Sequence, residues 1–279
     1  MNVMTYGQLR HYLNTNLSQI MDPMEATAEG RRWLKEGLGL SLAWVIAHND
    51  EMVPDSSARQ IESWLHQRRQ GKPWSYIIGW TSFLGRRYCV TPNTLIPRPE
   101  TEMVLKLALD LGSTLKVQRA CDIGTGSGVI AISMALSTNW EVTATDISTK
   151  ALCIAKKNAI NLQAIVKFYH GDLLTVVPDP IELVVSNPPY IDPADEVMLS
   201  KELMFEPKIA LFANNQGFAV ADEILRQAFN RSARGCVLEI GSGQGNILQN
   251  QALTVGWHHT KIHKDLAGHD RALLAWRTT

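Results

Sequence analysis

The sequence predicts an α/β protein in which a doubly wound, mostly parallel sheet follows a small helical domain and a β-hairpin. From about residue 118 onward, short β-branched runs alternate with helical patterns, and this order builds a parallel sheet covered on both faces. A glycine-rich loop follows the first of these runs, at the edge where such sheets bind their ligands. The first 72 residues instead show only the helical spacing of apolar side chains.

Residues 1–72 are predicted to form an N-terminal helical domain with four segments. Thr5 suits the N-cap of the first segment, whose apolar residues recur at helical spacing between positions 9 and 20. The second segment lies around position 33, and the third covers residues 41–48. The fourth begins near Pro54 and ends in a cationic turn followed by a glycine, as helix C-termini prefer. Three tryptophans form either the core of this domain or an aromatic docking surface: Trp33, Trp44 and Trp64.

Residues 73–96 form the predicted linker between the two domains. Two apolar runs, 76–79 and 83–90, have the composition of strands, and we expect them to pair as a β-hairpin. The second domain then covers residues 97–279 and begins with a helix at its Pro-Glu-Thr-Glu block. The helix start does not explain Arg98, whose direction is restricted by a proline on either side.

The alternation in the second domain predicts five parallel strands and a closing antiparallel pair. The parallel strands are expected at residues 119–123, 141–145, 166–169, 181–186 and 235–240. Helices are expected around residues 129–136, 150–161, 218–229 and 244–253. The last two strands are joined by a short loop, so we expect them to pair antiparallel, at residues 257–263 and 271–276.

The composition is that of an ordinary globular protein, with 279 residues, 45% hydrophobic and 19% charged. The net charge is zero and the pI about 7.1, so the overall basic charge that holds nucleic acid by general attraction is missing. Four cysteines have no paired spacing, so we expect neither disulfides nor a metal site, and a reducing cytoplasm suits them. No signal peptide is recognisable, and no apolar run approaches the ~18 residues that span a bilayer. We expect a cytoplasmic monomer that binds neither membranes nor nucleic acid.

The loop after the first predicted strand has alternating glycines, which let a ligand approach the backbone closely. Its pattern, G-x-G-x-G, differs from the G-x-G-x-x-G dinucleotide fingerprint, whose third glycine falls one residue later. By itself the loop indicates only that a nucleotide-like group binds there. It comprises Gly124, Thr125, Gly126, Ser127 and Gly128.

Acidic residues follow the next two predicted strands. Asp146 ends the second strand, where a carboxylate accepts hydrogen bonds from ribose hydroxyls. The alternative role for Asp146 is a helix N-cap before Ser148. Asp172 and Leu173 follow the third strand, where the carboxylate would meet the exocyclic amine of an adenine and the leucine its face. The alternative for this pair is a plain turn.

The stretch Asn187-Pro188-Pro189-Tyr190 follows the fourth predicted strand. Asn187 offers a side-chain carbonyl oxygen, and the two prolines hold the backbone extended, so the Pro188 carbonyl can point outward. Two acceptor oxygens, with the flat ring of Tyr190, suit a planar NH2 group. The alternative is a polar turn at the strand end. A nucleoside held on the first three strands would bring its reactive end close to this stretch.

Taken together, these motifs resemble the class I S-adenosylmethionine-dependent methyltransferases. More narrowly, the chain resembles the HemK/PrmC family, whose members methylate the glutamine side-chain amide in peptide chain release factors. The resemblance extends from about residue 67 to the end. Its most specific signals are the Pro-Arg-Pro-Glu-Thr-Glu block at residues 97–102 and the pair Glu206-Pro207.

The resemblance implies a Rossmann-like fold, S-adenosyl-L-methionine as cofactor and release factors as protein substrates, with the helical domain helping to recognise them. It assigns cofactor binding to the loop of residues 124–128 and to four further residues: Asp146, Asp172, Leu173 and Asn187. It assigns substrate binding to Asn187, Pro188, Pro189 and Tyr190. The expected catalytic residues are Asn187, Pro188 and Tyr190, and no metal is required.

Other functions fit parts of the pattern. Adenine presents the same NH2 group, so the nearest alternative is an adenine N6-methyltransferase acting on DNA or RNA. Flipping a base normally calls for a basic groove, and the neutral net charge argues against it. A nicotinamide-dependent oxidoreductase conflicts with the glycine spacing. A catalytically silent binding protein conflicts with the intact Asn-Pro-Pro-Tyr stretch.

Overall fold

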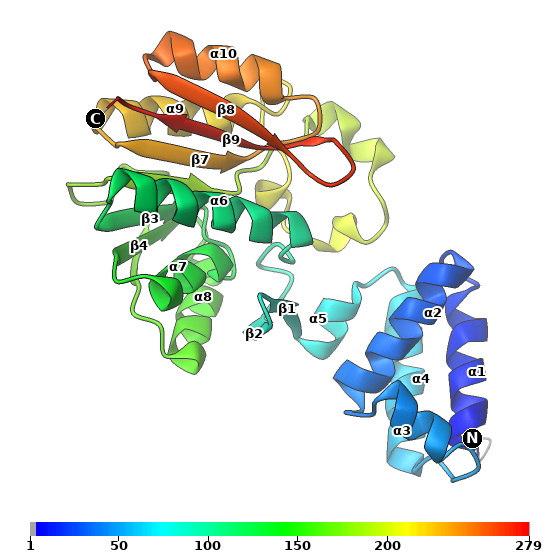
Figure 1. Ribbon diagram of the computed structural model, residues 1–279. Helices are drawn as coiled ribbons and strands as arrows, with labels where there is room; N and C mark the ends of the chain where they lie inside the picture. Colours follow the sequence, from blue (N-terminus) through cyan, green and yellow to red (C-terminus); the bar gives the residue numbers. More distant parts are fainter. Residues whose placement is uncertain (1–3, 279) are drawn as a thin grey trace. The chain divides into compact units, whose positions relative to one another are not determined.

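The computed structural model describes residues 4–278. Residues within 1–78 form one compact unit, and residues within 79–279 form another (Figure 1). The first unit is built from helices, and the second contains a seven-stranded sheet flanked by helices. The predicted fold class is therefore confirmed. Within the described residues, no helix is both long enough and apolar enough to cross a membrane.

Six helical segments build the first unit. They are α1 Tyr6–Leu17, α2 Pro23–Arg32, the π-helical η1 Trp33–Gly37, α3 Leu42–Ala47, α4 Asp55–Arg69 and α5 Trp74–Ile78. The first five correspond to the four predicted segments, which are confirmed. Thr5 caps α1 as expected: its hydroxyl accepts from the Gln8 N–H, and the Gln8 side chain accepts from the Thr5 N–H in a capping box.

Tryptophan rings form the centre of the first unit. Trp33 stacks on Trp74 with 4.7 Å between ring centroids, and Trp64 packs edge-on against both rings. All three are almost completely buried, whereas Trp44 is half-buried and packs edge-on against Tyr6. The core interpretation is therefore confirmed for Trp33 and Trp64.

The predicted strand at residues 76–79 is wrong, because these residues lie in or directly after α5. The N–H groups of Tyr76 and Ile77 both donate to the Pro73 carbonyl, at 3.0 and 3.1 Å, and so begin a helical turn. Gly79, with a φ of 78°, ends the turn as glycines after helices commonly do. Periodicity cannot tell a strand from a helix in so short an apolar run. The helix is favoured here because it carries a tryptophan ring into the core.

Seven strands form the main sheet in the order β5-β4-β3-β6-β7-β9-β8 (Figure 1). They are β3 Arg119–Ile123, β4 Glu141–Asp146, β5 Lys167–His170, β6 Leu183–Ser186, β7 Gly235–Glu239, β8 His259–Lys264 and β9 Asp270–Trp276. The first five in chain order are parallel and the closing pair is antiparallel, as predicted. Because the chain returns from β5 to place β6 beside β3, a ligand crevice is expected at the carboxyl ends of these two strands.

Helices cover both faces of the sheet. One face carries α6 Pro99–Leu115, α7 Val129–Ser137 and α8 Thr149–Leu162, and the other carries α9 Ala219–Asn230 and α10 Gly245–Val255. Successive strand residues enter the two cores in turn: Ala120 packs with the first group of helices, and Cys121 packs with the second. The doubly wound arrangement is therefore confirmed.

A β-hairpin precedes α6 within the second unit. Its strands are β1 Trp80–Phe83 and β2 Arg86–Cys89. The second strand lies within the predicted run 83–90, but its partner is the segment just before that run and not the predicted run 76–79. The turn residues Leu84 and Gly85 both have positive φ, 47° and 72°, as a type I′ hairpin requires. Asn158 of α8 accepts from the Cys89 N–H at 2.8 Å and donates to the Ser127 carbonyl at 2.8 Å. This side chain ties the hairpin to the glycine loop.

A long loop connects β6 to α9. It contains three short 3-10 turns, η2 Pro193–Met198, η3 Leu203–Phe205 and η4 Lys208–Ala210. Its ends are held together, because the Ile191 N–H donates to the Leu211 carbonyl and the Ala213 N–H donates to the Ile191 carbonyl, each at 3.0 Å. The segment between these contacts, residues 192–210, is called the 192–210 loop below.

Candidate active site

A cavity of about 400 Å³ opens at the carboxyl ends of β3, β4 and β6, where the strand order predicts a crevice. A volume of this size suits a nucleoside-sized ligand. All but two of the predicted site residues line it: Gly124, Thr125, Gly126, Ser127, Asp146, Asp172, Leu173, Asn187, Pro188 and Pro189. Among the predicted residues, Gly128 and Tyr190 are the two outside its lining.

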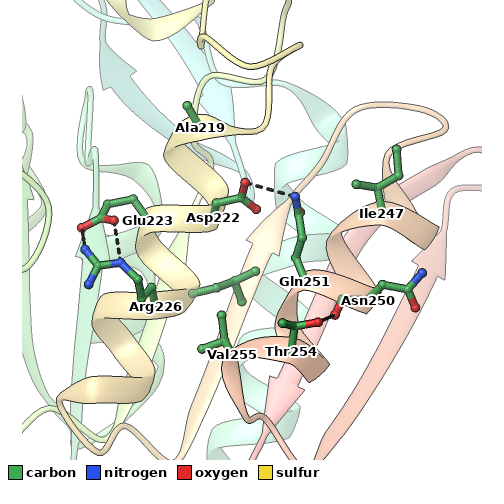
Figure 2. A pocket seen from close by; sticks show the side chains of 10 residues that line it. Ala219, Asp222, Glu223, Arg226, Ile247, Asn250, Gln251, Thr254 and Val255 are labelled. Carbon is green, nitrogen blue, oxygen red and sulfur yellow. Dashed lines mark hydrogen bonds and ion pairs between the residues drawn. The ribbon is translucent and has the colours of Figure 1, made fainter.

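A second cavity, of about 510 Å³, lies between α9 and α10 (Figure 2). Gln251 donates to the Asp222 carboxylate across it at 3.1 Å, and Glu223 pairs with Arg226 on α9. None of the predicted site residues lines this second cavity. The first cavity is therefore the candidate active site.

The glycine loop presents its backbone to the first cavity. Gly124 and Gly126 have φ values of 66° and 57°, which residues other than glycine rarely adopt. A Cβ placed on Gly124 would meet no atom within 4 Å, so open space lies against the peptide here. Gly128 differs, because a Cβ there would come within 2.9 Å of Ile132 and 3.2 Å of Ala155. Gly128 thus lets α7 approach α8, and it caps α7 rather than lining the cavity.

Asp122 braces the loop from the end of β3, a role that was not predicted. Its carboxylate accepts from the Thr125 hydroxyl at 2.6 Å and from the Ala131 N–H at 3.1 Å. Burial raises the pKa of Asp122 to about 7, although both hydrogen bonds oppose the change. The carboxyl is inside the protein and does not line the cavity, so its contribution is to hold the loop in shape.

Asp146 connects the ends of two neighbouring strands. One carboxylate oxygen accepts from the Ser148 N–H and the other from the Gly126 N–H, both at 2.8 Å. Burial raises the pKa of Asp146, against these two hydrogen bonds. The N-cap of α8 is Ser148, whose hydroxyl accepts from the Ala151 N–H, so the alternative role of Asp146 as that cap is wrong. Each carboxylate oxygen keeps a second lone pair, which leaves Asp146 able to accept from a ligand.

Asp172 and Leu173 follow β5 and line the cavity. The Thr175 hydroxyl donates to the Asp172 carbonyl at 2.6 Å, so the stretch does form a turn. Leu173 has a φ of 47°, in the left-handed region, and is half-buried, while Asp172 is exposed. The turn and the cavity wall are compatible, because the turn is what brings both residues to the wall.

Asn187 is the first residue after β6 and lies at the cavity wall beside the buried Pro188. Its Nδ2 donates to the Thr101 hydroxyl oxygen at 3.2 Å. The Thr101 hydroxyl in turn donates to the Glu239 carboxylate at 2.7 Å. Thr101 lies in the first turn of α6, and Glu239 is the last residue of β7. Sequence reasoning gave neither residue a role.

Tyr190 is held through its backbone. The Gln244 side chain donates to its carbonyl at 3.1 Å, and a Cβ on Gly217 would come within 2.2 Å of the same oxygen. Gly217 also has a φ of 87°, so both the backbone conformation and the lack of space exclude a larger residue there. Burial, followed by the nearby charge of Glu239, raises the pKa of the Tyr190 phenol to about 12. The hydroxyl therefore keeps its proton at neutral pH.

Arg98 forms an ion pair with Glu206, which accounts for the arginine that the helix start left unexplained. The Glu206 side chain is almost fully buried and also accepts from the Ile96 N–H at 3.0 Å. Burial raises the pKa of Glu206, and the charge of Arg98 opposes this. Pro97 and Pro207 stand next to the two partners and both line the cavity. The pair therefore holds two cavity walls together.

Comparison with known families and proteins identifies the family to which this chain belongs. Residues 8–79 match the PrmC N-terminal domain, and residues 104–223 match the methyltransferase small domain. The release factor glutamine methyltransferase of Bordetella pertussis is 36% identical over 90% of this chain and 95% of its own length. Those of Enterococcus faecalis and Neisseria gonorrhoeae are 37% and 38% identical, over 83% and 82% of this chain and 85% and 86% of their own lengths. The chain belongs to the release factor glutamine methyltransferase family. The predicted resemblance and the methyltransferase class are confirmed.

Solved structures with little sequence similarity share the fold of this family member. The catalytic domain of hMettl16 in complex with the MAT2A 3′UTR hairpin 6 superposes with a TM-score of 0.58 at 16% identity, over 81% of this chain and 84% of that one. A methyltransferase from Pyrococcus furiosus gives 0.52 at 16% identity, over 80% of this chain and all of that one. At such identities the likeness shows the fold alone.

The cavity of this family member is supported by residue pairs that sequence reasoning missed. Thr101 and Glu206 lie in the two most specific motifs, but their partners lie 138 and 108 positions away in the chain. Only the fold brings these pairs together. Within residues 4–278, no group of three or more His, Cys, Asp or Glu side chains is placed to hold a metal ion.

Proposed function

We propose that this protein methylates the side-chain amide nitrogen of a glutamine in a peptide chain release factor, with S-adenosyl-L-methionine as methyl donor. The observation that carries the proposal is the state of the Asn187 carboxamide. Its Nδ2 is engaged by Thr101, which leaves Oδ1 as the atom for a ligand in the cavity. An acceptor at this place suits an NH2 group, and membership of the family supports glutamine as its source.

The cavity walls fit S-adenosyl-L-methionine. The open backbone at Gly124 and Gly126 leaves room for a ligand to lie against the peptide planes. Asp146 would accept hydrogen bonds from the ribose hydroxyls, and Asp172 with Leu173 would bind the adenine. When bound, this cofactor supplies a methyl group activated by a positively charged sulfur.

The residues after β6 would hold the substrate amide. An amide nitrogen is a poor nucleophile, because its lone pair is delocalised into the carbonyl group. Asn187 Oδ1 and the Pro188 carbonyl would accept its two N–H groups, and these bonds strengthen as the nitrogen becomes tetrahedral and positive. The prolines keep the backbone stiff, so the amide is aligned for methyl transfer before the reaction begins. Because the proton leaves the nitrogen after transfer, the mechanism calls for no general base.

The 192–210 loop offers a surface for a protein substrate beside the cavity. Val197 and Met198 are 88% and 82% exposed, which is unusual for neighbouring apolar side chains. Ile209, in the same loop, is exposed and also lines the cavity. We propose that this loop and the helical unit, which matches the PrmC N-terminal domain, both contact the release factor. Such a substrate implies that the protein acts in the cytoplasm, and we propose that it acts there as a monomer.

The proposal is tested by incubating the purified protein with methyl-labelled S-adenosyl-L-methionine and a bacterial release factor. We expect label on one glutamine of the release factor, located by mass spectrometry of its peptides. A release factor with that glutamine replaced by alanine is the matched control and should stay unlabelled. An adenine-containing oligonucleotide is tested in parallel, and label on the nucleic acid alone would overturn the proposed substrate.

A further inference from the structure

Asn187 lines the cavity and is the last member of a buried series of hydrogen bonds. Asn187 donates to Thr101 at 3.2 Å, and Thr101 donates to Glu239 at 2.7 Å. Thr101 and Glu239 are each 2% exposed, so water does not compete for these contacts. The sheet sets the spacing, because Ser186 pairs with Leu238 in register, and Asn187 and Glu239 directly follow these two residues. The first turn of α6 then places Thr101 between them.

The chain of contacts has a direction. An ionised carboxylate can only accept hydrogen bonds, so the single proton of the Thr101 hydroxyl points to Glu239. The hydroxyl oxygen then has only lone pairs to offer Asn187, and it takes the Nδ2 side of the carboxamide. The opposite side of the same planar group, Oδ1, is thereby turned away from Thr101.

We propose that Thr101 and Glu239 are positioning residues that hold the Asn187 carboxamide with its oxygen toward the substrate amide. This inference rests on the proposed function, because it assumes that the substrate presents an NH2 group to Asn187. A flipped carboxamide would offer N–H donors to N–H donors, and the substrate amide would lose an acceptor. An unsupported asparagine can adopt both orientations. The hydrogen bonds that link Glu239 through Thr101 to Asn187, called the relay below, therefore raise the fraction of enzyme that is ready to react.

Several charged and titratable groups surround Glu239. Glu100 lies on α6, Arg98 lies just before it, Arg271 lies on β9 and Tyr190 follows β6. Burial, with the Glu100 charge added, raises the pKa of Glu239 to about 7, while the Thr101 hydrogen bond and the two arginines oppose the rise. A protonated Glu239 can donate to Thr101, which frees the hydroxyl proton to turn toward Asn187. The enforced orientation is therefore present above about pH 7 and is lost as the pH falls through that value.

The first test removes the hydroxyl without changing the shape of the side chain. Thr101→Val should lower kcat for release-factor methylation at least tenfold, with the Kd for S-adenosyl-L-methionine changed less than threefold. Thr101→Ser restores the hydroxyl and should recover kcat to within about threefold of the unmodified protein. Thr143→Val is the matched control, because it also removes a threonine hydroxyl that donates a hydrogen bond, here to the Ala120 carbonyl, but it lies outside the cavity lining. An equal loss of cofactor affinity in Thr101→Val, or failure of Thr101→Ser to recover activity, would overturn the positioning role.

The second test uses pH. For the unmodified protein, kcat should rise as the pH increases through about 7, whereas Glu239→Gln should have a flat profile over the same range. This variant keeps the shape of the side chain and cannot ionise, so it also covers the case in which Thr101→Val does not fold. The same rise in both proteins would assign the titration to another group and overturn the role of Glu239.

A third measurement separates this inference from the proposed function. Selective ¹⁵N labelling of asparagine allows the side-chain NH2 signals of Asn187 to be assigned as those lost in Asn187→Ala. These signals should shift with a midpoint near pH 7 in the unmodified protein and stay constant in Glu239→Gln. If release factor is not methylated but the signals titrate in this way, the proposed function fails and the relay stands. If methylation occurs but the signals titrate identically in both proteins, the relay fails alone.

Discussion

The two halves of the active-site cavity are built in different ways. One half, which we propose binds the cofactor and call the cofactor half, consists of the consecutive residues 124–127 and of acidic residues at the ends of β4 and β5, so neighbouring residues in the chain position each group. The other half, which we propose holds the substrate amide and call the substrate half, depends on pairs that are distant in sequence. Asn187 is 86 positions from Thr101, and Arg98 is 108 positions from Glu206.

This difference has a consequence for what each half can do. Burial raises the pKa values of two carboxyl groups in each half: Asp122 and Asp146 in the cofactor half, and Glu206 and Glu239 in the substrate half. In the cofactor half both carboxyls hold the glycine loop, whose backbone gives a ligand its shape and N–H groups. We therefore expect substitutions in the cofactor half to change cofactor binding, and substitutions in the substrate half to change turnover.

The largest expected effect comes from Asn187→Ala. The variant removes the acceptor that strengthens its hydrogen bond as the substrate nitrogen becomes positive, so kcat should fall about 10³-fold, or ~4 kcal/mol. The Kd for S-adenosyl-L-methionine, measured by calorimetry, should stay within about threefold. Asn250→Ala, in the cavity between α9 and α10, is the control and should change neither value (Figure 2). Equal losses of turnover and cofactor affinity would mean that Asn187 belongs to the cofactor half.

Asp146→Ala should have the opposite profile. Loss of the carboxylate removes hydrogen bonds to the proposed ribose and also frees the Gly126 N–H, so the Kd for the cofactor should rise about 30-fold, or ~2 kcal/mol. At saturating cofactor, kcat should remain within about threefold, because Asp146 does not touch the substrate amide. Asp146→Asn keeps the shape and one acceptor and should give an intermediate Kd. An unchanged Kd in both variants would leave Asp146 with a structural role only.

The same contrast explains which parts of the molecule could be predicted from sequence. The strands of the main sheet, the glycine loop and the residues at strand ends follow from local patterns, and all of them were found within a few residues of their predicted positions. Local patterns could not predict the roles of the Thr101 hydroxyl and of the Glu206 and Glu239 carboxyls. Each role depends on a partner that is distant in the chain. The short apolar run before Gly79 was predicted incorrectly for the same reason, since tertiary burial of a tryptophan decides its conformation.

Arg98→Ala tests whether distant pairing stabilises the substrate half. It leaves the buried Glu206 with the Ile96 N–H but without a charge partner, and should lower the free energy of unfolding by about 1.5 kcal/mol at pH 8. This value is smaller than for a fully buried pair, because solvent reaches about a third of the Arg98 side chain.

The cost of Arg98→Ala should shrink toward pH 5. Burial already raises the pKa of Glu206, and loss of the arginine raises it further, so the carboxyl becomes neutral as the pH falls and needs no partner. Lys106→Ala breaks an exposed ion pair with Asp110 on the same helix and should cost less than 0.5 kcal/mol at either pH, by denaturant titration. A cost for Arg98→Ala that grows toward low pH would contradict this account of the pair.

The smallest expected effect concerns the outer rim of the substrate half. Met198→Asp places a charge on the exposed apolar part of the 192–210 loop, and it should raise the KM for release factor about threefold, since one rim contact contributes little. Neither kcat nor the cofactor Kd should change, because the side chain does not line the cavity. Ile165→Asp is the matched control and should leave KM unchanged. Ile165 is 87% exposed, but it precedes β5 and so lies at the amino end of that strand, whereas the cavity lies at the carboxyl ends of the strands. If both variants raise KM equally, the change reflects net charge, and the 192–210 loop is not a contact surface for the release factor.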